Sequence, residues 1–142
     1  MSMFARRILL GVTAAIGVYV GLWAAVWPTG FYDAFPGFGR IWVAVDGPFN
    51  EHLIRDVGAL YLGLAVASIA AAFARDAAAA RVVGVAWTVF GLPHLLYHVT
   101  KLGGMATVDA IGNVVSLGGN LALGILLMLP GPRETIDEKE DV

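Results

Sequence analysis

The fold is decided by a run of twenty residues without a charged side chain, ILLGVTAAIGVYVGLWAAVW (residues 8–27). At about 1.5 Å of rise per residue, a helix of this length crosses the roughly 30 Å hydrocarbon core of a bilayer. Three further uncharged runs follow at residues 57–74, 82–100 and 110–132. Each is long enough for one crossing, so the sequence predicts an all-α fold, a four-helix transmembrane bundle.

The composition favours this interpretation over a soluble bundle or a secreted protein. Of the 142 residues, 58% are hydrophobic and 14% charged, and the first run has no polar face for water. That run is also longer than the apolar part of a signal peptide, about 7 to 15 residues. We expect one transmembrane domain over residues 1–132 and a disordered, acidic cytoplasmic tail over residues 133–142.

Two broad classes of function are excluded by residue content. The chain has no cysteine, which excludes disulfides, thiolate metal sites and thiol chemistry. Its formal net charge is -2, and no Lys or Arg cluster exceeds the pair Arg6 and Arg7, so nucleic acid is not an expected partner. The expected partners are the lipid bilayer and other membrane chains or further copies of this chain.

The basic residues divide unevenly between the two ends of the predicted bundle. If the N-terminus is cytoplasmic, that side holds Arg6, Arg7, Arg75, Arg81, Arg133 and Lys139. The opposite side holds only Arg40, Arg55 and Lys101. Because Lys and Arg concentrate on the cytoplasmic side, we expect a multi-pass protein of a bacterial plasma membrane with both termini in the cytoplasm.

The longest connection, residues 28–50, is rich in aromatic and turn-forming residues. Its aromatic residues are Phe31, Tyr32, Phe35, Phe38, Trp42 and Phe49. Amphipathic rings favour the headgroup level of a membrane, which predicts an extracytoplasmic cap there. A loop packed over the outer end of the bundle explains the same residues, and both alternatives stay open.

Polar residues at the outer ends of the predicted helices define a candidate site. At the start of the second helix, Glu51 and Arg55 are four residues apart, as are His52 and Asp56, and this spacing suits ion pairs. These pairs can also act only on each other, near the positive end of the helix dipole. Polar residues within membrane spans are costly, so their gathering at one depth on three helices indicates a function.

The third and fourth helices supply the remaining candidates. His94 and His98 are four apart and can face one point, either as two metal ligands or as hydrogen-bonded rings near the helix end. Asp109, Asn113, Ser116 and Asn120 share one helix face. Hydrogen bonding between helices, worth about 0.6 kcal/mol per contact, also explains the amides and the serine.

The predicted site contains no catalytic residue. Its candidate ligand-binding residues are Glu51, His52, Arg55, Asp56, His94, His98, Asp109 and Asn113. Its candidate metal ligands are His52, His94 and His98. These residue types suit a metal ion, a haem or a polar small molecule, and they do not specify a cofactor.

Small residues indicate close helix packing. Gly17 and Gly21 lie four apart on the first helix, and the second helix is rich in alanine. Small residues let helix backbones approach closely within a membrane. Their partner is either a neighbouring helix or another chain.

Several short motifs carry a resemblance to a known family. The first run ends in Trp27-Pro28 before the aromatic loop, and the second helix opens with RDVGALYL at residues 55–62. This order resembles the small four-helix DoxX-like membrane proteins. The segments NEHL (residues 50–53) and PHLLYH (residues 93–98) resemble an uncharacterised actinobacterial branch of such proteins. The resemblance implies a four-helix membrane fold and an occasional association with membrane redox complexes, and it assigns no catalytic residue.

Two functions follow as hypotheses. The first is an accessory or interaction subunit of a larger membrane complex, which packs through its glycine and alanine faces. The alternative is a membrane-embedded protein that binds a metal, a haem or a small molecule at the outer histidine and carboxylate site, in a redox role or another. Transport ranks third, because four short helices form a pore only as an oligomer.

The distribution of basic residues predicts the topology. A reporter fused after Val142 should lie in the cytoplasm, and a tag within residues 28–50 should be accessible to protease from outside intact cells. Protection of the tag from protease would contradict the predicted orientation.

Overall fold

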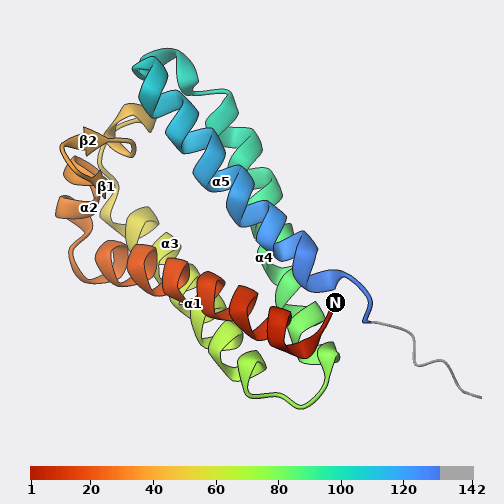
Figure 1. Ribbon diagram of the computed structural model, residues 1–142. Helices are drawn as coiled ribbons and strands as arrows, with labels where there is room; N and C mark the ends of the chain where they lie inside the picture. The colour runs from red at the N-terminus through yellow and green to blue at the C-terminus, as the bar shows by residue number, and fades with distance from the viewer. Residues whose placement is uncertain (132–142) are drawn as a thin grey trace, which may run out of the picture.

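The computed structural model describes residues 1–131, and four long helices dominate this part of the chain (Figure 1). They are α1 (Met3–Val26), α3 (Glu51–Ala72), α4 (Ala77–Val99) and α5 (Thr107–Met128). Each is long and apolar enough to cross a membrane. The all-α prediction is confirmed, and the chain is a multi-pass membrane protein. The predicted tail, residues 133–142, lies outside the described residues.

The helices α1, α3 and α4 begin earlier than the uncharged runs, and a polar residue caps each of them. Ser2, Asn50 and Asp76 each accept a hydrogen bond from a backbone N–H in the first turn of the following helix. Such caps satisfy N–H groups that have no partner within the helix. The cap at Asp76 also assigns the alanine run at residues 77–80 to α4.

The connection after α1 is more regular than the sequence analysis predicted. It contains α2 (Pro28–Ala34), the antiparallel strands β1 (Pro36–Gly37) and β2 (Arg40–Ile41), and a short 3-10 helix (Ala44–Asp46). Phe38 and Gly39 make the hairpin turn with φ of 58° and 72°. These positive angles suit the twist of a two-residue hairpin turn. The later connection, from α4 to α5, turns through a 3-10 helix at Leu102–Gly104, where the paired glycines predicted a break.

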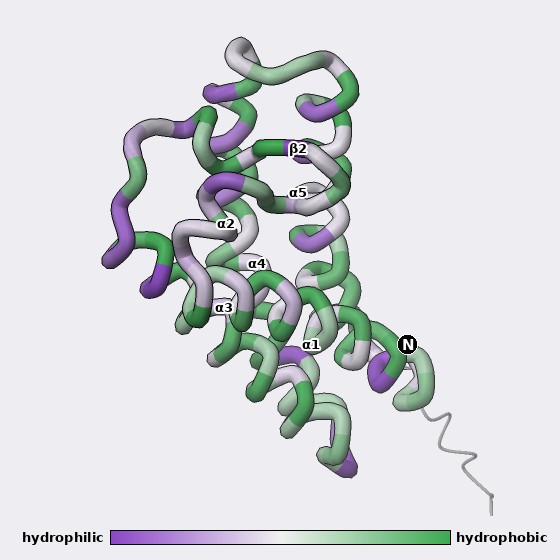
Figure 2. The backbone as a smooth tube through the Cα atoms, turned by 90° about the vertical axis from the view of Figure 1, so that its left-hand side faces the viewer, coloured by the Kyte–Doolittle hydropathy of each residue, from purple (hydrophilic) through white to green (hydrophobic). Residues whose placement is uncertain are grey.

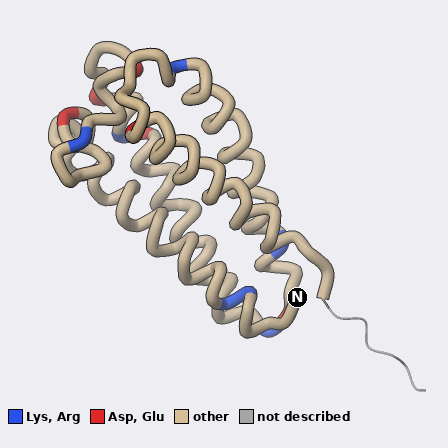
Figure 3. The backbone as a smooth tube through the Cα atoms, turned by 45° about the horizontal axis from the view of Figure 1, so that its top comes forward, with Lys and Arg blue, Asp and Glu red and all other residues tan. Residues whose placement is uncertain are grey.

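The four long helices alternate in direction, so the bundle has two ends (Figure 1). We call the end that carries residues 27–50 and 100–106 the loop end, and the opposite one the N-terminal end. Charged residues gather at both ends and leave the middle uncharged (Figure 3). Hydropathy follows the same division, with hydrophobic residues dominating the spans (Figure 2). This distribution is the one expected of helices that cross a bilayer.

Glycines allow the helices to pack closely as two pairs, α1 with α3 and α4 with α5. A Cβ atom added at Gly17 would lie 2.8 Å from Cβ of Ala65, and one at Gly84 would lie 2.7 Å from the carbonyl oxygen of Gly124. Gly21 likewise faces α3, next to Leu62. The partner of the Gly17 and Gly21 stripe is therefore a neighbouring helix of the same chain.

A buried hydroxyl network joins the first pair to α4. The Ser68 hydroxyl accepts hydrogen bonds from Thr13 Oγ1 at 3.1 Å and from Trp87 Nε1 at 3.0 Å. It donates to the carbonyl of Leu64 at 2.8 Å. All three polar side chains are fully buried. Hydrogen bonds of this kind hold helices together where water is absent.

Arg6 joins α1 to the end of α5. The sequence analysis counted this residue among the charges of the N-terminal end, but its side chain is buried. Its Nη1 atom donates to the carbonyl of Leu127 at 2.6 Å, and Nη2 donates to the carbonyl of Leu129. The last carbonyls of a helix lack partners and carry partial negative charge, so a guanidinium there stabilises the helix end.

The glycine contacts predict a contrast between two substitutions in α3. A Cβ atom at Gly58 would lie 2.5 Å from the backbone nitrogen of Ala25, whereas one at Gly63 has open space around it. We expect Gly58→Ala to lower the free energy of unfolding by about 1–3 kcal/mol, because backbone cannot move aside easily. Gly63→Ala should be neutral or stabilising by up to about 1 kcal/mol. Steric-trapping measurements in bicelles would check both values, and equal effects would contradict the close packing.

Candidate functional site

A cavity of about 1220 Å³ lies toward the loop end. It is lined by α1, α3, α4 and α5 and by the segment that connects α1 to α3. Below it, the two helix pairs are joined by the Ser68 network, and α4 has no fully buried residue beyond Gly91. The prediction of a polar pocket beneath an aromatic segment agrees with this arrangement.

One side of the cavity is aromatic. Rings from α3 and from the connecting segment line it, and they include Phe31, Tyr32, Phe35, Trp42, Phe49 and Tyr61. Several of them contact one another, as with Phe31 and Phe35, whose ring centroids are 4.5 Å apart. The segment packs over the loop end of the bundle, as the second alternative predicts, and a position of its rings at the headgroup level stays a prediction. Rings packed in this way form a rigid apolar wall.

The opposite side, formed by α4 and α5, is polar. His94 and His98 have ring centroids 4.8 Å apart, so the prediction that the two rings face one point is confirmed. Phe90 stacks on His94 at 4.9 Å. From α5, Asn113 and Asn120 reach the same cavity and are only 3% and 7% exposed. An aromatic wall facing a polar wall suits an amphipathic ligand.

Asp46 is a site residue that the sequence analysis missed. One carboxylate oxygen, Oδ2, lies 3.3 Å from Nδ1 of His98, and both side chains are largely buried. Burial raises the pKa of the Asp46 carboxyl, and the nearby charges of His98 and Lys101 oppose that rise. In the sequence, Asp46 precedes Gly47-Pro48 and was interpreted as part of a turn. Its partner is 52 positions away along the chain, so no local spacing indicated the pair.

Three buried oxygens in this region have no hydrogen-bond partner among residues 1–131. They are Oδ1 of Asp46, Oδ1 of Asn113 and Oδ1 of Asn120. All three residues line the cavity. Leaving a buried acceptor unpaired costs about 1–3 kcal/mol, so nearly all such groups in folded proteins have a partner. A ligand that donates hydrogen bonds would satisfy them.

The predicted pairs at the start of α3 form, but they lie at the surface. Arg55 Nε donates to Glu51 at 2.9 Å, and Arg55 also donates to the carbonyl of Ala25 at the end of α1. His52 lies 3.3 Å from Asp56, with 88% of its side chain exposed. Glu51 and His52 line the rim of the cavity, whereas Arg55 and Asp56 do not line it. The predicted ligand-binding role of Arg55 and Asp56 is thus replaced by local pairing.

Asp109, another predicted ligand-binding residue, anchors the connecting segment instead. Its Oδ1 atom accepts hydrogen bonds from Arg40 Nη1 and Trp42 Nε1, both at 2.8 Å. Trp42 also packs on Gly112, where an added Cβ would come within 2.9 Å of the ring. Asp109 does not line the cavity. These two hydrogen bonds, from a guanidinium and an indole N–H, hold the carboxylate away from the cavity.

The three histidines do not form the predicted metal site. Within residues 1–131, no group of three or more His, Asp or Glu side chains is arranged to hold a metal ion. His52 is turned to Asp56 at the surface, apart from the facing rings of His94 and His98. Zinc sites in proteins have three or four protein ligands, so the arrangement of these donors does not match a zinc site built on the three histidines.

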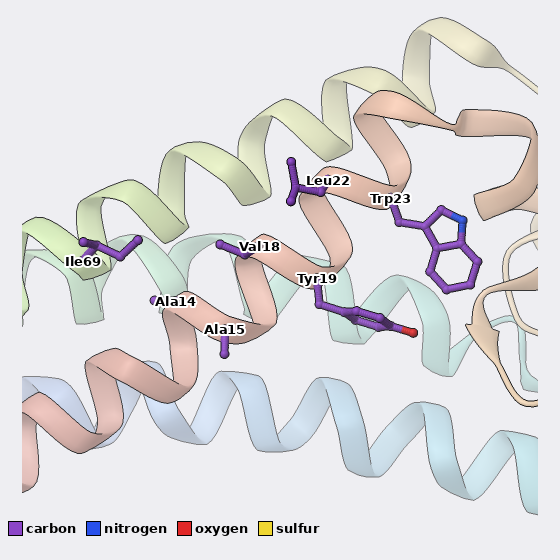
Figure 4. A pocket seen from close by; sticks show the side chains of 7 residues that line it. All are labelled: Ala14, Ala15, Val18, Tyr19, Leu22, Trp23 and Ile69. Atoms are coloured by element: carbon purple, nitrogen blue, oxygen red, sulfur yellow. The ribbon is translucent and has the colours of Figure 1, made fainter.

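A second hollow on the outside of the bundle lacks comparable chemistry (Figure 4). It is a shallow groove of about 750 Å³ lined by Ala14, Ala15, Val18, Tyr19, Leu22, Trp23 and Ile69. These side chains come from α1 and α3 and are almost entirely apolar. Such a surface suits lipid chains, so the candidate functional site is the inner cavity.

Comparisons with protein-family models, with curated proteins and with solved structures find no match to this chain.

The environment of Asp46 predicts how stability changes with pH. Because the carboxyl pKa is higher in the folded protein than in the unfolded chain, its contribution to stability is present at low pH and is lost as the pH rises through the folded pKa. Asp46→Asn removes this loss while keeping the shape and one acceptor oxygen. Its thermal midpoint in detergent should exceed the wild-type value at neutral pH.

The difference should disappear below about pH 4, where an ordinary carboxyl group is protonated. Asp33→Asn, at an exposed position on α2, is the matched control and should show no gain. A lower midpoint for Asp46→Asn at neutral pH would instead mean that the pair with His98 outweighs the cost of burial.

Proposed function

We propose that this protein binds a small amphipathic organic molecule in the cavity at its loop end. The observation that carries the proposal is the set of unpaired, buried oxygens of Asp46, Asn113 and Asn120 in a cavity that aromatic rings also line. A cavity of about 1220 Å³ is large enough for a drug-sized or lipid-like ligand. The polar part of the ligand would contact α4 and α5, and its apolar part would contact the rings.

The other hypothesis, an accessory subunit, loses part of its support, although Gly11, Gly63, Gly118 and Gly119 have open space around them and leave small-residue positions for a partner chain. It depended on glycine and alanine faces available to a partner chain. Gly17, Gly21 and Ala65 instead pack between α1 and α3, and Gly84 and Gly124 pack between α4 and α5. Binding of a small molecule therefore explains more of the structure than packing against a larger complex.

The proposal includes an orientation in the membrane. Among residues 1–131, the basic residues of the N-terminal end include Arg7, Arg75 and Arg81, whereas most of the acidic residues lie at the loop end (Figure 3). The positive-inside rule then supports a cytoplasmic N-terminal end in a bacterial plasma membrane. The cavity would open on the extracytoplasmic side. Membership of the DoxX-like proteins remains part of this proposal, on the motifs quoted above.

Filling the cavity tests the proposal. Val57 lines the cavity on α3, and Val18 lines the outer groove on α1. We expect Val57→Trp to reduce saturable uptake of 1-naphthylmethanol, a neutral aromatic alcohol, by about tenfold or more, because the indole occupies the ligand's space. Val18→Trp is the matched control and should bind like the wild type. Equilibrium dialysis of protein-containing against empty nanodiscs measures the uptake.

Native mass spectrometry of gently purified protein gives a second measurement. A small molecule that copurifies with the wild type and with Val18→Trp should be absent from Val57→Trp. If neither a copurified molecule nor saturable uptake is found in the wild type, or if both valine variants behave alike, the binding function is contradicted.

A further inference from the structure

The charges around the cavity point to the class of ligand, an inference that rests on the proposed function. Among the described residues that line it, the side chains with a fixed charge are the acids Asp46 and Glu51, and none is Lys or Arg. An anionic ligand would therefore meet carboxylates and no Lys or Arg. The basic groups that line the cavity are the imidazoles of His52, His94 and His98, and His52 and His98 already face Asp56 and Asp46. A cation or a neutral molecule fits this distribution better.

The nearby basic residues at the loop end are held elsewhere. Arg40 is bound to Asp109, and Arg55 to Glu51. The Lys101 ammonium lies 5.5 Å from the centre of the Tyr97 ring, an arrangement typical of a cation–π contact. Arg40 and Arg55 would have to break their ion pairs to reach a bound anion. Lys101 does not line the cavity, and it lies near enough to Asp46 to offset part of the carboxylate's charge.

The unpaired groups of the polar wall are acceptors. Asp46 uses Oδ2 for His98 and keeps Oδ1 without a partner in the described chain. The amide oxygens of Asn113 and Asn120 are in the same state, and both side chains are more than nine-tenths buried. These groups are all acceptors, and an ammonium group suits such a site because it donates hydrogen bonds and accepts none.

The aromatic wall also favours a cationic ligand. Ring faces carry negative potential and attract cations, most strongly where water is excluded. Phe31, Trp42, Phe49 and Tyr61 line the cavity with Asp46. The same rings provide apolar contact for the body of the ligand.

We propose that the cavity binds a protonated organic amine with an aromatic or otherwise apolar body. The ammonium group donates to Asp46 Oδ1, and the apolar body lies among the rings. The amide oxygens of Asn113 and Asn120 are available to further hydrogen-bond donors on the ligand. The carboxylate of Asp46 makes the largest electrostatic contribution, because it is the buried acid of the site.

Three probes of the same size separate charge from shape. They are 1-naphthylmethylammonium, 1-naphthylmethanol and 1-naphthoate, offered at neutral pH to the full chain in nanodiscs. The ammonium probe should bind about tenfold or more tightly than the alcohol, and the carboxylate should bind most weakly. Asp46→Asn should reduce binding of the ammonium probe about tenfold and change binding of the alcohol by less than about twofold.

Asp33→Asn removes an exposed carboxylate from the same connecting segment and should leave all three affinities unchanged, which controls for net charge. Alcohol binding in Asp46→Asn shows that the variant is folded. Equal affinities for ammonium and alcohol, a preference for the carboxylate, or an unchanged ammonium affinity in Asp46→Asn would overturn the amine inference while leaving the binding site itself intact. Failure of the site itself would appear differently, as no saturable uptake of any probe or no effect of Val57→Trp.

Discussion

The Ser68 hydroxyl is the point on which the arrangement of the four helices depends. Through it, Thr13 of α1 and Trp87 of α4 are bound to α3 in a region without water. Arg6 adds the bond from α1 to the carbonyls at the end of α5. Both sets of hydrogen bonds lie in the half of the bundle nearer the N-terminus. The helices are thereby fixed to one another in that half, and the half at the loop end is left to enclose the cavity.

Close packing within each helix pair confines the open space to the region between the pairs. Because glycines bring α1 against α3 and α4 against α5, little space remains inside either pair. The space between the pairs is filled near Trp87 by a fully buried indole. Beyond Gly91, histidine and asparagine side chains face the opening in place of large apolar ones. The cavity is therefore the region where the sequence replaces packing residues with polar ones.

The sequence predicted those features whose causes are local. Uncharged runs located the four spans, and four-residue spacing located the pairs Glu51 with Arg55 and His52 with Asp56 and the facing rings of His94 and His98. These contacts follow from helix geometry once the helix is known. The stripe of amides on α5 was located by the same periodicity.

The missed features depend on distant partners. Asp109 was assigned to the site because nothing in its neighbourhood shows that Arg40 and Trp42 fold back onto it, from 69 and 67 positions away. Asp46 was taken as a turn residue because its partner His98 belongs to another helix. The burial of Arg6 was not predicted, because the carbonyls it binds lie at the other end of the chain. Composition and periodicity contain no information on such pairings.

The anchor at Asp109 has a consequence for chain entropy. Residues 27–50 form a long connection between two helices, and closing a long loop costs more conformational entropy than closing a short one. Asp109 of α5 binds Arg40 and Trp42 near the middle of this connection. The connection is thereby divided into two shorter loops. An insertion on one side of the anchor can then be accommodated on that side alone, and the position of the other half over the cavity is preserved.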